Sequence, residues 1–264
     1  GGARLNTSAK FSGFIPAEVF SSYFAEHRKS AFTLAEVLIT LGIIGIVAAL
    51  TLPALIQKNN NRIVETRLMK FYSAINQAVQ RAEADYGDKK YWYNDSNSVN
   101  IDSEGKPVNG SSTGEKWFNK YIGSYMTVIK VEYDENARPT FFFKDGTALK
   151  LMAGSMQTSQ DFALRDWIFY TSYPSKCIKQ YGSEENARGK CAFAFMYVPE
   201  TTDPNRNQYR YLLGKGFEPY KFNWDGSKEF IDSRCKNGLP EYCTALIQIN
   251  NWKIPDDYPY KVSY

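Results

Sequence analysis

The longest apolar stretch of the chain covers residues 32–56 and contains one charged residue, Glu36. About 20 apolar residues are enough for a helix to cross the hydrocarbon core of a bilayer. The stretch is too long for a secretory signal peptide, whose apolar region has about 7–15 residues and precedes its cleavage site. The sequence therefore predicts a membrane-spanning helix over residues 32–56.

Four residues inside this stretch are unusual for a simple anchor. A carboxylate at the centre of a membrane helix costs about 2.5–3.5 kcal/mol, so such charges usually have a function. Glu36 lies near the end of the stretch, where a tolerated interfacial charge is the simpler alternative. Gly42 and Gly45 let another helix approach closely. Pro53 removes a backbone donor, so we expect a kink there.

The residues around the start of the stretch resemble the prepilin-type motif of type IV pilins and type II secretion pseudopilins. A basic segment, His27-Arg28-Lys29, and then Ser30-Ala31 come before Phe-Thr-Leu, an isolated glutamate and the apolar run. The resemblance implies that prepilin peptidase cleaves between Ala31 and Phe32, and that Phe32 is then N-methylated. Ala31 stands where the family prefers glycine, and the implied leader of 31 residues is longer than usual.

The resemblance also assigns roles to residues beyond the cleavage site. Phe32 and Glu36 are implied to act in filament assembly, with the carboxylate neutralising the terminal amine of a neighbouring subunit. The segment from Gly45 to Pro53 corresponds to the part of the helix that can loosen in filaments. The implied partners are prepilin peptidase, copies of the chain or other pilin-like subunits, and the inner membrane. The implied location is a single-pass inner-membrane protein whose C-terminal domain lies outside the cytoplasm, and a periplasmic or cell-surface filament after assembly.

A second pattern begins after residue 56, where apolar residues recur at spacings of three and four. This spacing places them on one face of a helix, which we expect to end near Tyr86 with Gly87 as its C-cap. The face should pack against a sheet of the same chain. Its members are Val64, Leu68, Phe71, Ile75, Val79 and Ala82.

The remainder of the chain predicts a sheet with polar connections. Strand patterns cover residues 125–133, 140–143, 147–152, 191–198 and 220–224, and Asp145-Gly146 lies in a hairpin signal between the second and third. Residues 94–116 read as a surface loop, residues 161–170 as a short helix, and the apolar run after Cys243 as strand-like. The predicted fold class is α+β, with a long N-terminal helix packed on an antiparallel sheet. The family resemblance implies the lollipop shape of pilins.

The predicted organisation has four parts. Residues 1–31 are a leader or a non-native remnant, and residues 32–56 form the transmembrane and assembly helix. Residues 57–86 are its amphipathic continuation. Residues 87–264 form a globular α+β domain.

All four cysteines follow the apolar stretch: Cys177, Cys191, Cys235 and Cys243. An even number of cysteines beyond a membrane span indicates disulfides and an oxidising compartment. Three connectivities are open, and we favour the local pairs Cys177–Cys191 and Cys235–Cys243. A zinc site is the weaker alternative, because the sequence has no Cys-x-x-Cys spacing and no histidine after the stretch.

No motif predicts catalysis. The single histidine, His27, precedes the implied cleavage site, so the mature chain has no Ser-His or Cys-His pair. Glu200, Asp203, Asn205 and Asn207 supply oxygen ligands as a calcium loop might, but their spacing matches no EF-hand, so we favour a plain polar loop. We expect no metal and no cofactor.

The resemblance to the prepilin-type motif, together with the lack of a catalytic motif, implies a structural subunit of a type IV pilus or a type II secretion pseudopilus. The net charge of +4 is not gathered into a basic run, so we expect no nucleic-acid partner. The alternative is an extracytoplasmic enzyme or binding domain that uses the apolar helix only as a single-pass membrane anchor.

Overall fold

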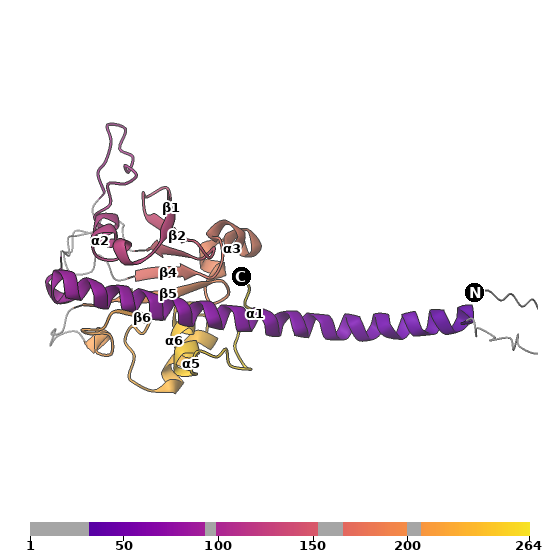
Figure 1. Cartoon of the computed structure of the whole chain (residues 1–264). Coiled ribbons are helices and arrows are strands. Elements are labelled where there is room, and N and C mark those ends of the chain that lie inside the picture. The colour runs from indigo at the N-terminus through magenta and orange to yellow at the C-terminus, as the bar shows by residue number, and fades with distance from the viewer. Residues whose placement is uncertain (1–31, 93–98, 153–165, 200–206) are drawn as a thin grey trace, which may run out of the picture. The chain divides into compact units, whose positions relative to one another are not determined.

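The computed structural model describes residues 32–92, 99–152, 166–199 and 207–264 (Figure 1). The chain divides into two compact units, Gly1–Leu50 and Thr51–Tyr264, which are described separately below.

Helix α1, Leu34–Tyr86, is the longest element, with 53 residues. In the second unit one face of α1 is buried, and it includes all six residues of the predicted apolar face together with Ala78. The helix ends as predicted: Gly87 has a φ of 81°, and its N–H donates to the carbonyl of Glu83 at 2.9 Å. Glycine favours this position because a side chain at positive φ is strained.

The sheet has six antiparallel strands arranged in sequence order. The predicted hairpin is confirmed: Phe141 pairs with Leu149 across it, and Gly146 in its turn has a φ of 79°. The strands are β1 Val128–Tyr133, β2 Pro139–Phe143, β3 Ala148–Leu151, β4 Asp166–Tyr170, β5 Ala192–Tyr197 and β6 Phe217–Pro219. The long N-terminal helix and the antiparallel sheet together confirm the α+β class.

Aromatic side chains fill the layer between α1 and the sheet. Phe71 of α1 stacks on Phe169 of β4, with ring centroids 4.1 Å apart, and meets Phe195 of β5 edge-on at 5.1 Å. Phe118 stacks on Phe141 of β2 at 3.9 Å. These residues bury large areas, so the core on this face dominates the packing of the globular unit.

The shorter helices are placed around the sheet (Figure 1). The α-helices are α2 Thr113–Tyr121, α3 Pro174–Tyr181, α4 Glu184–Ala187, α5 Lys228–Lys236 and α6 Cys243–Ile249. Single 3-10 turns occur at η1 Lys89–Tyr91, η2 Gly123–Tyr125, η3 Asn207–Tyr209 and η4 Pro240–Tyr242.

Two disulfides fasten these helices. Cys177 in α3 is joined to Cys191 just before β5, with Cα atoms 5.9 Å apart. Cys235 in α5 is joined to Cys243 at the start of α6, with Cα atoms 4.9 Å apart. These are the two local pairs that the sequence favours.

Four expectations about secondary structure were wrong at least in part. The helix expected over residues 161–170 is strand β4 over its described part, because a short apolar run buried on both faces has no distinguishing period. The strand expected at residues 220–224 lies instead at β6, Phe217–Pro219. The expected segment leaves the sheet, and Asn223 within it has a φ of 54°, outside the β region. The apolar run after Cys243 is helix α6. The expected loop over residues 94–116 ends inside α2, whose first residue is Thr113.

Candidate assembly site

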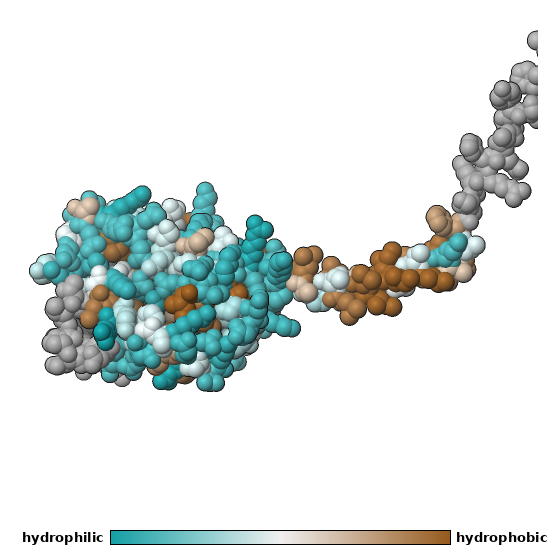
Figure 2. Space-filling view, turned by 90° about the horizontal axis from the view of Figure 1, so that it is seen from below, coloured by the Kyte–Doolittle hydropathy of each residue, from teal (hydrophilic) through white to brown (hydrophobic). Residues whose placement is uncertain are grey.

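The first half of α1 presents its apolar side chains outward. Leu38, Ile39 and Ile44 are each about 60% exposed, at 61%, 62% and 62%. Among the described residues, α1 is the one helix long and apolar enough to cross a membrane. Figure 2 shows this stretch as a brown band, whereas the visible described surface of the globular unit is mostly hydrophilic.

A reciprocal cap closes the N-terminus of α1. The backbone N–H and the hydroxyl of Thr33 both donate to Oε2 of Glu36, each at 2.8 Å. The N–H of Glu36 donates back to Oγ1 of Thr33 at 3.2 Å. This is a capping box, which satisfies backbone donors that the first turn of a helix leaves unpaired. Within this chain, therefore, the Glu36 carboxylate is already bound to its own helix terminus.

The sequence analysis missed this cap, although the signal was readable. Thr33-Leu34-Ala35-Glu36 has the Ser/Thr-x-x-Glu spacing of a capping box at the start of an apolar run. The assembly role that the resemblance gives Glu36 is a different use of the same carboxylate and stays a prediction.

The residues implicated in helix flexibility lie inside α1. A methyl group added at Gly42 or Gly45 would meet nothing within 4 Å, so both glycines leave an open surface. Pro53 also lies inside α1, which continues through it without interruption. Its missing N–H leaves the carbonyl of Ala49 without its usual partner four residues on. The predicted kink at this position stays a prediction.

Several predicted site residues fall outside the described residues. Ala31, on one side of the implied cleavage site, is among them, while Phe32 on the other side is described and 83% exposed. Glu200, Asp203 and Asn205 of the weakly favoured calcium loop also lie outside, and Asn207 begins the short turn η3. In the part of the chain that the structure describes, no group of three His, Cys, Asp or Glu residues could hold a metal ion.

The C-terminal tail is fastened to α1 near the start of the globular unit. The side-chain amides of Gln57 and Asn60 donate to the carbonyl of Val262 at 3.3 and 3.5 Å. One turn further on, Glu65 accepts a hydrogen bond from the N–H of Ile254 at 2.9 Å. Val262 itself is buried, so the tail seals the apolar core where the amphipathic part of α1 begins.

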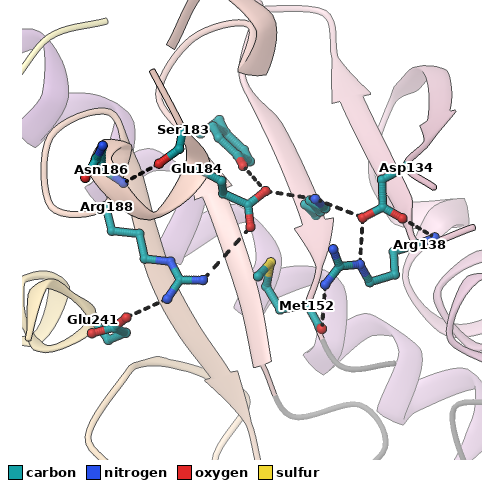
Figure 3. Close-up of polar contacts among 10 residues, drawn as sticks. Asp134, Arg138, Met152, Ser183, Glu184, Asn186, Arg188 and Glu241 are labelled. Carbon is teal, nitrogen blue, oxygen red and sulfur yellow. Dashed lines mark hydrogen bonds and ion pairs between the residues drawn. The ribbon is translucent and has the colours of Figure 1, made fainter. Parts of the chain in front are cut away.

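A charged network on the other face of the sheet links four segments of the globular unit: the turn between β1 and β2, β3, α4 with its C-cap, and η4 (Figure 3). Lys150 of β3 lies 3.1 Å from Asp134 and 2.8 Å from Glu184 of α4. Arg138 donates to Asp134 at 2.6 Å. Arg188 donates to Glu241 of η4 at 2.6 Å.

The network contains three acidic and three basic residues, so it is neutral as a whole. Lys150 is 9% exposed, and a charge buried this far needs close partners to offset its lost hydration. Burial by itself would raise the pKa of Asp134, but the N–H of Arg138 and the ammonium of Lys150 lower it below its ordinary value. The network of ion pairs therefore holds the β1–β2 turn, β3, α4 and η4 together. Sequence patterns gave no sign of it, because its members are up to about a hundred residues apart.

Comparison with known proteins adds two matches. Residues 27–52 match the prokaryotic N-terminal methylation motif, so the resemblance to the prepilin-type motif of type IV pilins and pseudopilins is confirmed. Residues 54–262 match a family of unknown function, DUF6613. No curated protein and no solved structure matches the chain. Because the second match covers well over half of its length, the chain belongs to the DUF6613 family, and it bears a prepilin-type motif at the start of its long helix.

Proposed function

We propose that this chain is a structural subunit of a type IV pilus or a type II secretion pseudopilus, and not an enzyme. In this proposal prepilin peptidase cleaves it and α1 then assembles with copies of the chain or with other pilin-like subunits. The observation that supports it most is the coincidence of the methylation motif with the start of an exposed apolar helix. A plain membrane anchor needs neither the motif nor a carboxylate five residues into the mature chain.

Cleavage between Ala31 and Phe32 would create a new terminal amine. That amine is positively charged, and methylation leaves the charge in place. Inside an apolar filament core a charge is costly unless an opposite charge lies beside it. The carboxylate of Glu36 on a neighbouring subunit would supply that charge.

Assembly would then exchange one set of contacts of Glu36 for another. In the free chain, Oε2 of Glu36 accepts two hydrogen bonds from Thr33. These capping bonds are charge-assisted, because their acceptor is a carboxylate. An ammonium adds a full opposite charge, and in an apolar core from which water is excluded that attraction is much stronger than in water. The terminal amine of a neighbour can therefore compete with the capping contacts.

The apolar surface of α1 between Glu36 and the globular unit is covered by lipid before assembly and by other helices afterwards. Lipid tails are as apolar as leucine, so helices associate there mainly through close packing. The open surfaces at Gly42 and Gly45 fit that requirement. The two disulfides are consistent with a globular unit outside the cytoplasm.

Substitution of Glu36 separates its two uses. Glu36→Ala removes the carboxylate half of the cap together with the charge, whereas Glu36→Gln keeps an oxygen acceptor for Thr33 and removes only the charge. We expect both variants to stay in the membrane fraction and to be lost from the sheared filament fraction of the native cells. Glu135→Ala, at an exposed position of the globular unit, is the matched control and should assemble normally.

Normal assembly of Glu36→Ala would contradict the proposal. Normal assembly of Glu36→Gln with failure of Glu36→Ala would show that the cap, and not the charge, is what assembly requires.

A further inference from the structure

The end of the globular unit that follows the predicted span is strongly basic. Three segments form this basic end: residues 57–67 of α1, helix α3 and the C-terminal residues 261–264 (Figure 1). They contain six basic residues and one acidic residue, namely Lys58, Arg62, Arg67, Lys176, Lys179 and Lys261, and Glu65. Their net charge is 6 − 1 = +5, so the rest of the chain has 4 − 5 = −1. A free carboxylate at Tyr264 would leave the basic end with +4.

The C-terminal residues hold the other two segments of the basic end together. They are hydrogen-bonded to α1 through the carbonyl of Val262. The hydroxyl of Tyr181, the last residue of α3, donates to the carbonyl of Lys261 at 3.3 Å. Near the start of α3, the ammonium of Lys176 donates to the main-chain oxygen of Tyr264 at 2.9 Å. The fold therefore brings into one surface basic residues that form no basic run in the sequence.

Most of the positive charge at the basic end is not neutralised by the chain itself. Glu65, its one acidic residue, is paired with Lys253 at 2.9 Å. Four of the six basic side chains are exposed and have no ion-pair partner among the described residues: Lys58, Arg62, Lys179 and Lys261. Like charges gathered on one surface create a potential that attracts ions of the opposite sign. The basic end is therefore suited to an anionic partner.

The position of the basic end along α1 matches the headgroup layer of a bilayer. The apolar surface of α1 continues to Ile56, which is 58% exposed. At 1.5 Å per residue, Lys58 lies about 3 Å and Arg62 about 9 Å beyond Ile56 along the helix axis. Lys261 adjoins Val262, which is bound to the same turn of α1. The polar layer on each side of the hydrocarbon core is about 5–8 Å thick, and long basic side chains extend along it.

We propose that the basic end binds the anionic headgroups of phospholipids in the leaflet that α1 leaves at Ile56. This contact holds the globular unit against the membrane until the subunit is assembled. Each Lys or Arg near an anionic membrane surface strengthens binding by about fivefold. A soluble polyanion offers the same phosphate groups, but it does not cover the exposed apolar residues 51–56 beside them. The inference goes beyond the proposed function and shares with it only the membrane span.

Reconstitution of the full chain, with one copy in each lipid nanodisc, tests the contact. The four native cysteines form two disulfides, so an introduced cysteine is the only free thiol. Ser175→Cys, at an exposed position of α3, carries a fluorophore. The nanodiscs contain phosphatidylcholine with or without phosphatidylglycerol, and a trace of lipid whose headgroup bears a nitroxide that quenches a nearby fluorophore. Ser103→Cys, at an exposed position outside the three basic segments, is the matched control for the label.

Phosphatidylglycerol should increase the quenching of the label at Ser175→Cys and leave that at Ser103→Cys unchanged. At about 1 M salt the increase should disappear, because the Debye length falls to about 3 Å. Equal quenching at Ser175→Cys in the two kinds of nanodisc would overturn the proposal.

Neutralising two of the exposed lysines assigns the effect to the basic end. Lys58→Gln combined with Lys261→Gln should lower the ratio of membrane-bound to free globular unit by about 25-fold. Lys116→Gln combined with Lys215→Gln makes the same change of charge at exposed positions of α2 and of the segment before β6. This matched pair should leave the quenching unchanged, and an equal loss with both pairs would overturn the proposal.

A DNA duplex added to nanodiscs of phosphatidylcholine tests the soluble polyanion. If it binds through Lys58 and Lys261 while phosphatidylglycerol has no effect, the lipid contact is wrong. Filaments that depend on Glu36 are measured separately in native cells, so failure of the lipid contact leaves the proposed function in place. A chain that does not insert into the nanodiscs would contradict the membrane span on which both proposals rest.

Discussion

The two halves of α1 use the same kinds of residue in opposite ways. Leu38 in the first half is 61% exposed, whereas Leu68 in the second half has no exposed surface. The first half is apolar around its whole circumference, while in the second half the buried residues share one face. The second half therefore has its partner within the chain, and the first half requires one outside it.

This difference separates folding from assembly. Substitutions in the second half should change the stability of the globular unit. Substitutions in the first half should leave that stability unchanged and alter membrane insertion or assembly. The predictions below compare the two halves by matched changes.

The largest expected effect comes from truncating a buried leucine. Leu68→Ala should destabilise the globular unit by about 2–5 kcal/mol, because it removes buried methyl groups and leaves a cavity. Leu38→Ala should leave the unfolding transition where it is. The measurement is denaturant unfolding of the full chain in detergent, followed by tryptophan fluorescence. A shift of similar size in both variants would contradict the separation of folding from assembly.

Removing a disulfide should act on the globular unit alone. Replacing Cys177 and Cys191 with serine should cost about 3 kcal/mol on the chain-entropy model, since the bond closes a loop with a separation of 14 residues. The pair Cys235 and Cys243 closes a separation of 8 and should cost about 2.5 kcal/mol. Unfolding midpoints measured with and without reductant check both values. Unchanged midpoints would show that neither bond constrains the unfolded chain.

The same glycine substitution should destabilise the globular unit in one region and leave its unfolding transition unchanged in the other. A methyl group at Gly216 would lie 2.0 Å from Oδ1 of Asn76, whose amide exchanges two 2.9 Å hydrogen bonds with Phe217 at the edge of the sheet. Gly216→Ala should therefore cost about 1–3 kcal/mol through unsatisfied buried groups. Gly42→Ala meets no atom and should leave the unfolding transition unchanged.

Equal stabilities of Gly216→Ala and Gly42→Ala would show that the edge of the sheet relaxes around the added methyl group. Gly42→Ala should have its effect on assembly and not on unfolding. It should weaken assembly, because close helix packing favours small residues.

Acid should weaken the globular unit through the charged network. The folded pKa of Asp134 lies below its ordinary value of 3.8. A carboxyl with a lowered folded pKa adds stability that is complete above the unfolded pKa and is lost as the pH falls toward the folded pKa. Unfolding free energies between about pH 5 and pH 2 should therefore fall more steeply for the native chain than for Asp134→Asn. Parallel curves would contradict this assignment.

Much of the fold could be predicted because the decisive signals are local. The spacing of Leu68, Phe71 and Ile75 marks the buried face of α1, and Asp145-Gly146 marks the hairpin. The failures have a physical reason as well. Strand β4 is buried on both faces and helix α6 is short, so neither has a readable period, and only tertiary packing decides between helix and strand.

The candidate site shows the same division. The methylation motif is contiguous and was identified from sequence, and the Thr33–Glu36 cap could have been read in the same way. The network around Lys150 could not, because it depends on pairings that only the folded sheet creates.

The central claim is that the exposed half of α1 becomes the N-terminus of a filament subunit. Mass spectrometry of the protein from native cells tests it most directly. The account predicts a mature chain that begins at Phe32, with a methylated amine. An intact Ala31–Phe32 bond, with an unmodified N-terminus, would contradict it.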